Sequence, residues 1–96
     1  MELQEALRIL AEHKQELTAR GAGSVAIFGS VARNEAGPDS DVDILVELNQ
    51  PMGLFGFAEL KEYLESILGQ RVDLVTPDGL KARIRDRILS EAVRAA

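Results

Sequence analysis

Apolar side chains recur along this chain with two different periods, which separate expected helices from expected strands. Spacing of three or four positions, typical of amphipathic helices, occurs in residues 3–20, 57–68 and 80–92. Short runs rich in β-branched side chains, typical of strands, occur in residues 24–28, 41–48 and 71–75. With a short helix expected at residues 30–35, the predicted order is α-β-α-β-α-β-α. This order indicates an α/β (α+β) fold in which helices flank a small three-stranded sheet.

The stretch at residues 41–48 is predicted to be a strand with one core-facing and one functional face. Successive side chains of a strand point to opposite sides of the sheet. The expected core-facing side chains are Val42, Ile44, Val46 and Leu48. Asp41, Asp43 and Glu47 are expected on the other face.

Gly21 and Gly69 follow the first two long helical stretches, and glycine is a common helix-ending residue. The first helix is therefore expected to run unbroken to about residue 20. The apolar stripe of the last helix is expected to be Leu80, Ile84, Ile88 and Ala92.

Composition and charge exclude several classes of protein and of chemistry. A chain of 96 residues is expected to form one domain, residues 1–96. The net charge of -5, from 16 acidic and 11 basic side chains, gives no general attraction to nucleic acid, so direct nucleic-acid binding is not expected. Charged residues among the first twenty interrupt any apolar stretch long enough for a signal peptide or a membrane span. The absence of cysteine excludes disulfides and cysteine nucleophiles and fits a cytoplasmic protein.

Three aspartates carry the candidate chemistry. Asp41 and Asp43 are two positions apart on the expected strand, so they leave the same face with Cα atoms roughly 6.5–7 Å apart. Carboxylates suit Mg²⁺, and two ions about 3.5–4 Å apart stabilise the attacking and leaving oxygens of an in-line phosphoryl displacement. Asp73, the acidic residue of the third strand, is expected to complete the metal site and to help deprotonate an acceptor hydroxyl. These aspartates are the predicted catalytic and metal-binding residues.

The end of the first strand is expected to hold phosphate. Gly29 permits close approach of the backbone, and Ser30 begins a helix whose free N–H groups point at an anion. The ten residues between Ser30 and Asp41 are expected to form a short helix and a tight turn that bring this end beside the aspartates. Arg33, one turn beyond Ser30, is placed to reach a triphosphate, and Glu35 to orient Arg33 or support the metal shell.

Each of these features also has an ordinary structural interpretation. An isolated Asp-x-Asp is usually a solvated strand face, and Arg33 with Glu35 can be a surface ion pair. His13 has no second histidine or cysteine to act with and is expected to be structural or exposed. The basic residues 81–87 are typical of a solubilising helix face, although Lys81 and Arg83 are candidates for contacts with nucleotide or partner. The combination of spacings favours nucleotidyl transfer.

The motif Gly-Ser-Val-Ala-Arg-Asn-Glu at residues 29–35, followed by Ser-Asp-Val-Asp at 40–43 and by Asp73, resembles the polymerase beta-like nucleotidyltransferase superfamily. Within it, the chain is similar to minimal nucleotidyltransferases of the MNT type over nearly its whole length. The resemblance implies a small mixed sheet flanked by helices. It also marks Ser40, inside the motif, as a possible supporting residue.

The resemblance implies transfer of a nucleoside monophosphate from a Mg²⁺-bound triphosphate to a hydroxyl, with release of pyrophosphate. It assigns the metal roles to Asp41, Asp43 and Asp73 and the triphosphate to Ser30. It further implies ATP as substrate and a HEPN-domain toxin as partner, which the MNT antitoxin adenylylates on tyrosine. Two alternatives stay open: a binding module that neutralises its partner by occlusion alone, and transfer to a small molecule such as an antibiotic.

Overall fold

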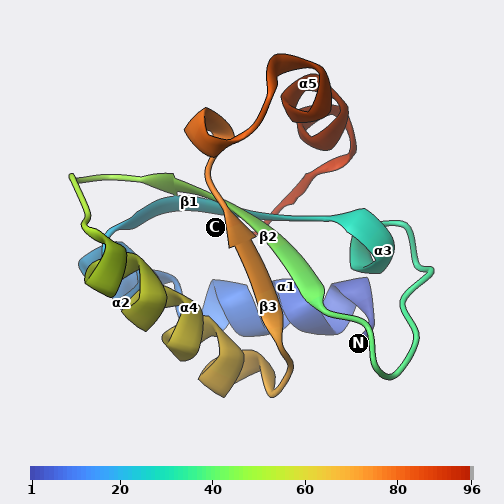
Figure 1. Cartoon of the computed structure of the whole chain (residues 1–96). Helices are drawn as coiled ribbons and strands as arrows, with labels where there is room; N and C mark the ends of the chain where they lie inside the picture. The colour runs from blue at the N-terminus through green and yellow to red at the C-terminus, as the bar shows by residue number, and fades with distance from the viewer. Residues whose placement is uncertain (96) are drawn as a thin grey trace.

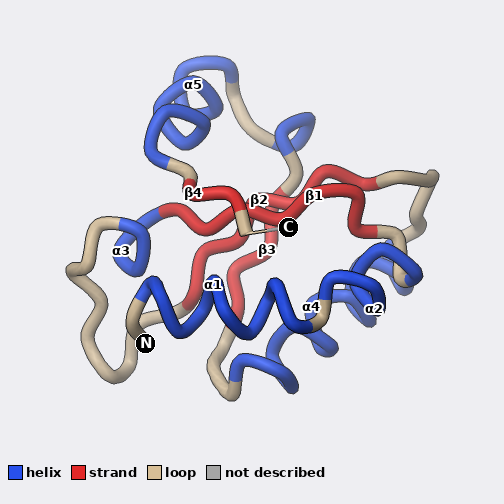
Figure 2. The backbone as a smooth tube through the Cα atoms, turned by 180° about the vertical axis from the view of Figure 1, so that it is seen from behind, coloured by secondary structure: helices blue, strands red, loops and turns tan. Residues whose placement is uncertain are grey.

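The computed structural model describes residues 1–95 and centres on a four-stranded mixed sheet in the order β3-β2-β1-β4 (Figures 1 and 2). Strand β1 (Ala22–Phe28) pairs antiparallel with β2 (Val42–Leu48), and β2 pairs parallel with β3 (Val72–Val75). The mixed sheet is therefore confirmed. The predicted count of three strands is wrong by one, because the two-residue strand β4 (Val93–Arg94) adds to the free edge of β1.

Helices cover both faces of the sheet (Figure 1). Helices α1 (Leu3–Glu12), α2 (Lys14–Ala19) and α4 (Leu54–Leu68) lie on one side, and α5 (Ala82–Glu91) lies on the other. A 3-10 turn, η1 (Pro77–Gly79), precedes α5. None of the helices described in residues 1–95 is both long and apolar enough to cross a membrane.

The single helix expected at residues 3–20 is two helices separated by His13. The backbone of His13 leaves the helical region at φ -106° and ψ 17°, and its Nδ1 lies 2.7 Å from the Ile9 carbonyl oxygen. Both halves still bury the predicted stripe, since Leu10 and Leu17 are at most 1% exposed. His13 therefore has the structural place expected for it.

Most of the core lies between the sheet and α1, α2 and α4. Val42, Ile44 and Val46 are fully buried there, which confirms the predicted core-facing set of β2, and Leu48 packs at its edge. A smaller cluster on the opposite face joins Leu45 to Phe28 and Ile88 and attaches α5 to the sheet. The predicted stripe of α5 is only partly buried, because Ile84 remains 48% exposed.

The link between β1 and β2 positions the site. Helix α3 (Gly29–Ala32) starts directly after β1 and is shorter than the helix expected at residues 30–35. Asn34, with a φ of 59°, turns the chain out of α3 toward β2. Asparagine tolerates this left-handed conformation better than most residues with a side chain. The link returns the chain so that the start of β2 lies beside the end of β1.

Candidate active site

Strand pairing brings two predicted aspartates to the same level of the sheet. Asp43 lies opposite Phe28 of β1 and, on its other side, in register with Asp73 of β3. Neighbouring strands are about 4.8 Å apart, so these aspartates are adjacent across the sheet. The alternation of β2 places Asp43 on the same face as Leu45, the face that α5 covers farther along the strand. The structure therefore places Asp73, the expected third aspartate, beside Asp43.

Asp41 lies at the same end of the sheet, immediately before β2. Its Oδ1 is 3.1 Å from Nε of Arg71, the residue before β3. Both side chains are well exposed, at 47% for Asp41 and 78% for Arg71, so this ion pair is weak and readily broken.

The negative charge of Asp43 is disfavoured by its surroundings. Its carboxyl is half-buried, and burial raises its pKa above the usual range. The negative charges of Asp73 and Asp41 raise that pKa further, whereas Arg33 partly opposes them. A carboxyl group with a raised pKa favours a positive partner, either a proton or a cation.

Gly29 makes a close approach to this carboxyl that no other residue type can make. Its φ of 71° lies in the left-handed region, and a Cβ added there would be 2.9 Å from Cγ of Asp43 and would collide with Oδ2. The turn after β1 and the aspartate of β2 therefore share one small space.

Glu91, which the sequence did not single out, contacts the glycine turn. The Gly29 N–H donates to Oε1 of Glu91 at 3.0 Å, and Nη1 of Arg33 lies 3.2 Å from Oε2 of Glu91. These contacts, led by the Gly29 N–H, lower the pKa of Glu91. Glu91 is 62 positions from Gly29, and only the packing of α5 brings the two together. No local sequence signal at the end of a basic helix points to such a contact.

Arg33 and Glu35 form the ion pair considered from the sequence. Nε of Arg33 lies 2.9 Å from Oε2 of Glu35. The two carboxylates, Glu35 first and then Glu91, raise the pKa of Arg33. Arg33 thus holds a fixed positive charge between the turn and solvent, where a phosphate can also reach it.

The other residues predicted from the sequence have fewer contacts with the aspartates and the glycine turn. Ser30 is half-buried in the first turn of α3, and the hydroxyl of Ser40 accepts from the Gly37 N–H at 3.0 Å in the turn that leads to β2. Lys81 and Arg83 lie at the start of α5, whereas Glu91 ends it. A rise of 1.5 Å per residue separates Arg83 from Glu91 by roughly 12 Å. Lys81 and Arg83 therefore lie far from the end of α5 that meets the glycine turn.

The aspartates do not converge fully in this arrangement. Within the described residues 1–95, no three acidic, histidine or cysteine side chains are gathered closely enough to hold a metal ion. Asp41 is paired instead with Arg71, at 3.1 Å. The donor chemistry still fits Mg²⁺, because carboxylate oxygens are the ligands that this ion prefers, and Asp41 is exposed while Asp43 is half-buried.

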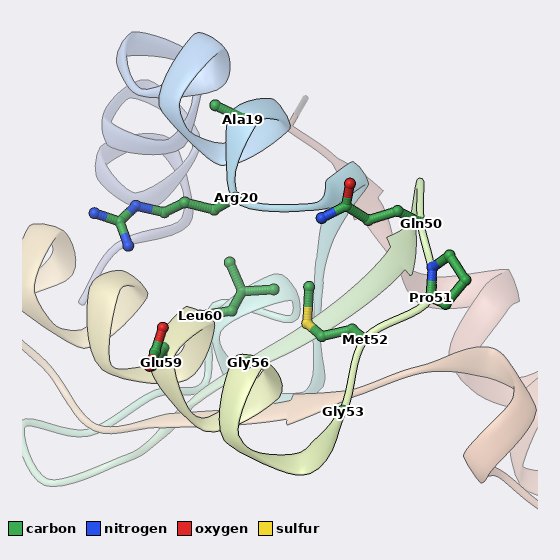
Figure 3. Close-up of a pocket in the computed structure, with 9 residues that line it drawn as sticks. All are labelled: Ala19, Arg20, Gln50, Pro51, Met52, Gly53, Gly56, Glu59 and Leu60. Carbon is green, nitrogen blue, oxygen red and sulfur yellow. The ribbon is translucent and has the colours of Figure 1, made fainter.

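A hollow of about 340 Å³ lies at the other end of β2 (Figure 3). Met52 and Leu60 line it with Arg20, Gln50 and Glu59. Its position beyond the carboxyl end of β2 separates it from Asp41 and Asp43, which are at the amino end. This hollow is therefore distinct from the aspartate site.

Comparison with known proteins gives consistent likenesses. The family model described as the nucleotidyltransferase domain matches residues 5–95. The protein adenylyltransferase MntA of Thermococcus cleftensis is 49% identical over 92 residues, which are 95% of this chain and 93% of that protein.

Solved structures extend the likeness to three dimensions. A candidate minimal nucleotidyltransferase is 47% identical, with a TM-score of 0.80 over 97% of this chain and 95% of the other. A complex of a tri-AMPylated HEPN toxin with an MNT antitoxin from Shewanella oneidensis matches with a TM-score of 0.66 and 18% identity, over 94% of this chain and 71% of that chain. The latter match shows a shared fold. All these likenesses span the segment from Gly29 to Asp73.

Proposed function

Since the chain belongs to the nucleotidyltransferase domain family, we propose that it is a protein adenylyltransferase that moves AMP from Mg²⁺-bound ATP to a tyrosine hydroxyl of a HEPN-domain toxin. In this proposal it is the antitoxin of the pair and acts in the cytoplasm. The observation that carries the proposal is the alignment of Asp43 and Asp73 beside the glycine turn at Gly29.

The residues divide into a phosphate side and a metal side. The N–H of Gly29, the hydroxyl of Ser30 and the guanidinium of Arg33 bind and orient the triphosphate. Asp41, Asp43 and Asp73 would hold two Mg²⁺ ions, which when bound would neutralise charge that develops on the phosphoryl oxygens. The raised pKa of Asp43 supports this assignment, because a cation relieves the repulsion that raises it.

The transfer step is a displacement at the α-phosphorus of ATP. The acceptor hydroxyl oxygen forms a bond to phosphorus as the bond to the pyrophosphate oxygen breaks, and the hydroxyl proton passes to Asp73. Asp73 is exposed, so an acceptor presented by a second protein can reach it.

Two likenesses support the acceptor and the partner. The Thermococcus relative, at 49% identity, is named a protein adenylyltransferase. The Shewanella structure contains an AMPylated HEPN toxin with an MNT antitoxin of the same fold as this chain.

The test is the intact mass of the HEPN-domain protein encoded beside this chain, after incubation with the purified chain, ATP and Mg²⁺. We expect a gain of one or more AMP groups. The matched control is the Asp41→Asn/Asp43→Asn variant, which keeps side-chain size and removes two metal-binding charges. This variant should fold and transfer nothing.

Other outcomes separate the alternatives. An unchanged mass together with a stable complex would indicate neutralisation by occlusion and would contradict the proposed transfer. AMP transfer to an aminoglycoside in the absence of protein partner would indicate a small-molecule acceptor. Transfer by the double-asparagine variant would refute the assigned metal residues.

A further inference from the structure

We propose that Glu91 is an internal competitor of the nucleotide, with its carboxylate occupying the donors that the triphosphate needs. One oxygen accepts from the Gly29 N–H at 3.0 Å, and the other lies 3.2 Å from Nη1 of Arg33. Both donors belong to the phosphate side assigned above, so this inference rests on the proposed function. ATP binding then requires Glu91 to leave.

The main chain on both sides of Glu91 is anchored. Ile88, one turn earlier, is buried against Phe28 and Leu45. Directly after α5, β4 pairs with Ala26 and Ile27 of β1, and the Ala95 N–H donates to the Val25 carbonyl at 2.9 Å. The backbone at Glu91 is therefore held at the glycine turn, and release of the carboxylate is a rotation of the side chain about its own bonds.

The contacts of Glu91 with Gly29 and Arg33 are weak enough for the nucleotide to displace them. Glu91 is 24% exposed and Arg33 is 44% exposed, so water weakens their ion pair. The carboxylate of Glu91 also adds to the negative charge felt by Asp43. A Mg²⁺-bound triphosphate replaces this unfavourable charge with a cation beside the aspartates, while its phosphate oxygens replace the two contacts of Glu91.

The test compares Mg²⁺-ATP affinity, measured by calorimetry, in the full chain and three variants of α5. Glu91→Gln removes the charge, and Glu91→Asp keeps the charge but shortens the side chain by one methylene. Asp86→Asn is the matched control, since Asp86 is an exposed acid on the same helix. We expect about three- to tenfold tighter binding for both Glu91 variants, the size of effect of one hydrogen bond of ordinary net strength. Asp86→Asn should change affinity less than about twofold, as a screened surface charge does.

Each outcome either supports or overturns the competition. Tighter binding by Glu91→Gln alone would show a general charge effect and would overturn competition by contact. Unchanged or weaker binding by both Glu91 variants would also overturn it, while ATP binding by the wild type would leave the proposed function standing. Failure of the wild type and every variant to bind ATP would overturn the proposed function, and with it the proposal that Glu91 competes with the nucleotide.

An NMR shift of the Gly29 N–H in Glu91→Gln without nucleotide would support the contact between Gly29 and Glu91 independently, and the absence of a shift would contradict it.

Discussion

At the scale of single residues, the glycine turn and the aspartate of β2 are sterically coupled. Gly29 has a left-handed backbone and also leaves the space that the Asp43 carboxyl fills. The types and spacing of these two residues are enough to predict that both belong to the site. Their mutual contact is not predictable in this way, because it depends on the register of β1 with β2.

Replacing Gly29 by alanine should therefore cost more than backbone strain alone. Gly69→Ala is the matched control, since Gly69 has a similar φ of 67° and a Cβ added to it would have no atom within 4 Å. We expect Gly69→Ala to lower the free energy of unfolding by about 1 kcal/mol, the usual cost of such a conformation. Gly29→Ala should cost about 1–3 kcal/mol more, as overpacking does. Urea denaturation of both variants measures the difference, and equal losses would contradict the steric coupling.

Asp43 should destabilise the fold at neutral pH when no cation is added. Because its pKa is higher in the folded than in the unfolded chain, the folded state binds the proton more tightly. Unfolding free energy therefore falls as pH rises from the unfolded pKa, about 3.9, through the raised folded pKa, and the penalty is complete above it. Asp43→Asn removes this penalty.

We expect Asp43→Asn to raise Tm by about 2–4 °C at pH 7, which corresponds to roughly 0.5 kcal/mol after allowance for solvent screening of a half-buried group. The gain should shrink as the pH is lowered through the raised pKa. Thermal melts in chelator across this range measure it. A gain that is independent of pH would show that the carboxyl charge is not its cause.

At the scale of elements, α5 shows where periodicity is informative and where it fails. Its apolar spacing correctly predicts a helix, but the stripe is not uniformly buried: Ile88 is 9% exposed and Ile84 is 48% exposed. The spacing of apolar residues identifies which face of a helix is apolar, but it does not show how far the sheet beneath that face extends.

Strand β4, with two residues, is too short to show any period and joins the sheet only because β1 has a free edge.

Replacing each isoleucine of α5 by alanine should show that the buried one contributes more to the free energy of unfolding than the exposed one. Ile88→Ala removes a buried contact with Phe28 and Leu45 and should cost about 2–3 kcal/mol in unfolding free energy. Ile84→Ala should change it by less than about 0.5 kcal/mol, as exposed substitutions usually do. Chemical denaturation of the two variants tests this, and similar losses would mean that the helix packs along its whole length.

At the scale of the whole molecule, the layers and the aspartate side of the site are largely predictable from the sequence. Alternation in β2 correctly separates the core side chains from the aspartates, because one face of that strand meets a continuous core. The break at His13 and the return of Glu91 to Gly29 are not predictable from local pattern. The former is a local departure inside a helical stripe, and the latter joins two residues that only the tertiary packing of α5 brings together.

The aspartates at this end of the sheet should couple metal binding to global stability. Mg²⁺ at ten times its dissociation constant should add about 1.4 kcal/mol to the free energy of unfolding and raise Tm by several degrees. The Asp43→Asn/Asp73→Asn variant is the control, because it keeps the size of both side chains. Thermal melts at millimolar Mg²⁺ should show a shift in the wild type and little in the variant. Equal shifts would indicate general ionic screening.

The end of β2 that is far from the aspartates is a suitable position for a fluorescent label. Gln50 and Pro51 are exposed in the turn after β2, whereas Asp43 lies near the strand's opposite end. The chain contains neither cysteine nor tryptophan, so a single cysteine introduced at Gln50 accepts one thiol-reactive dye without competing sites or a fluorescent background. A dye placed there can follow docking of a second protein by anisotropy while leaving the glycine turn and the aspartates chemically untouched.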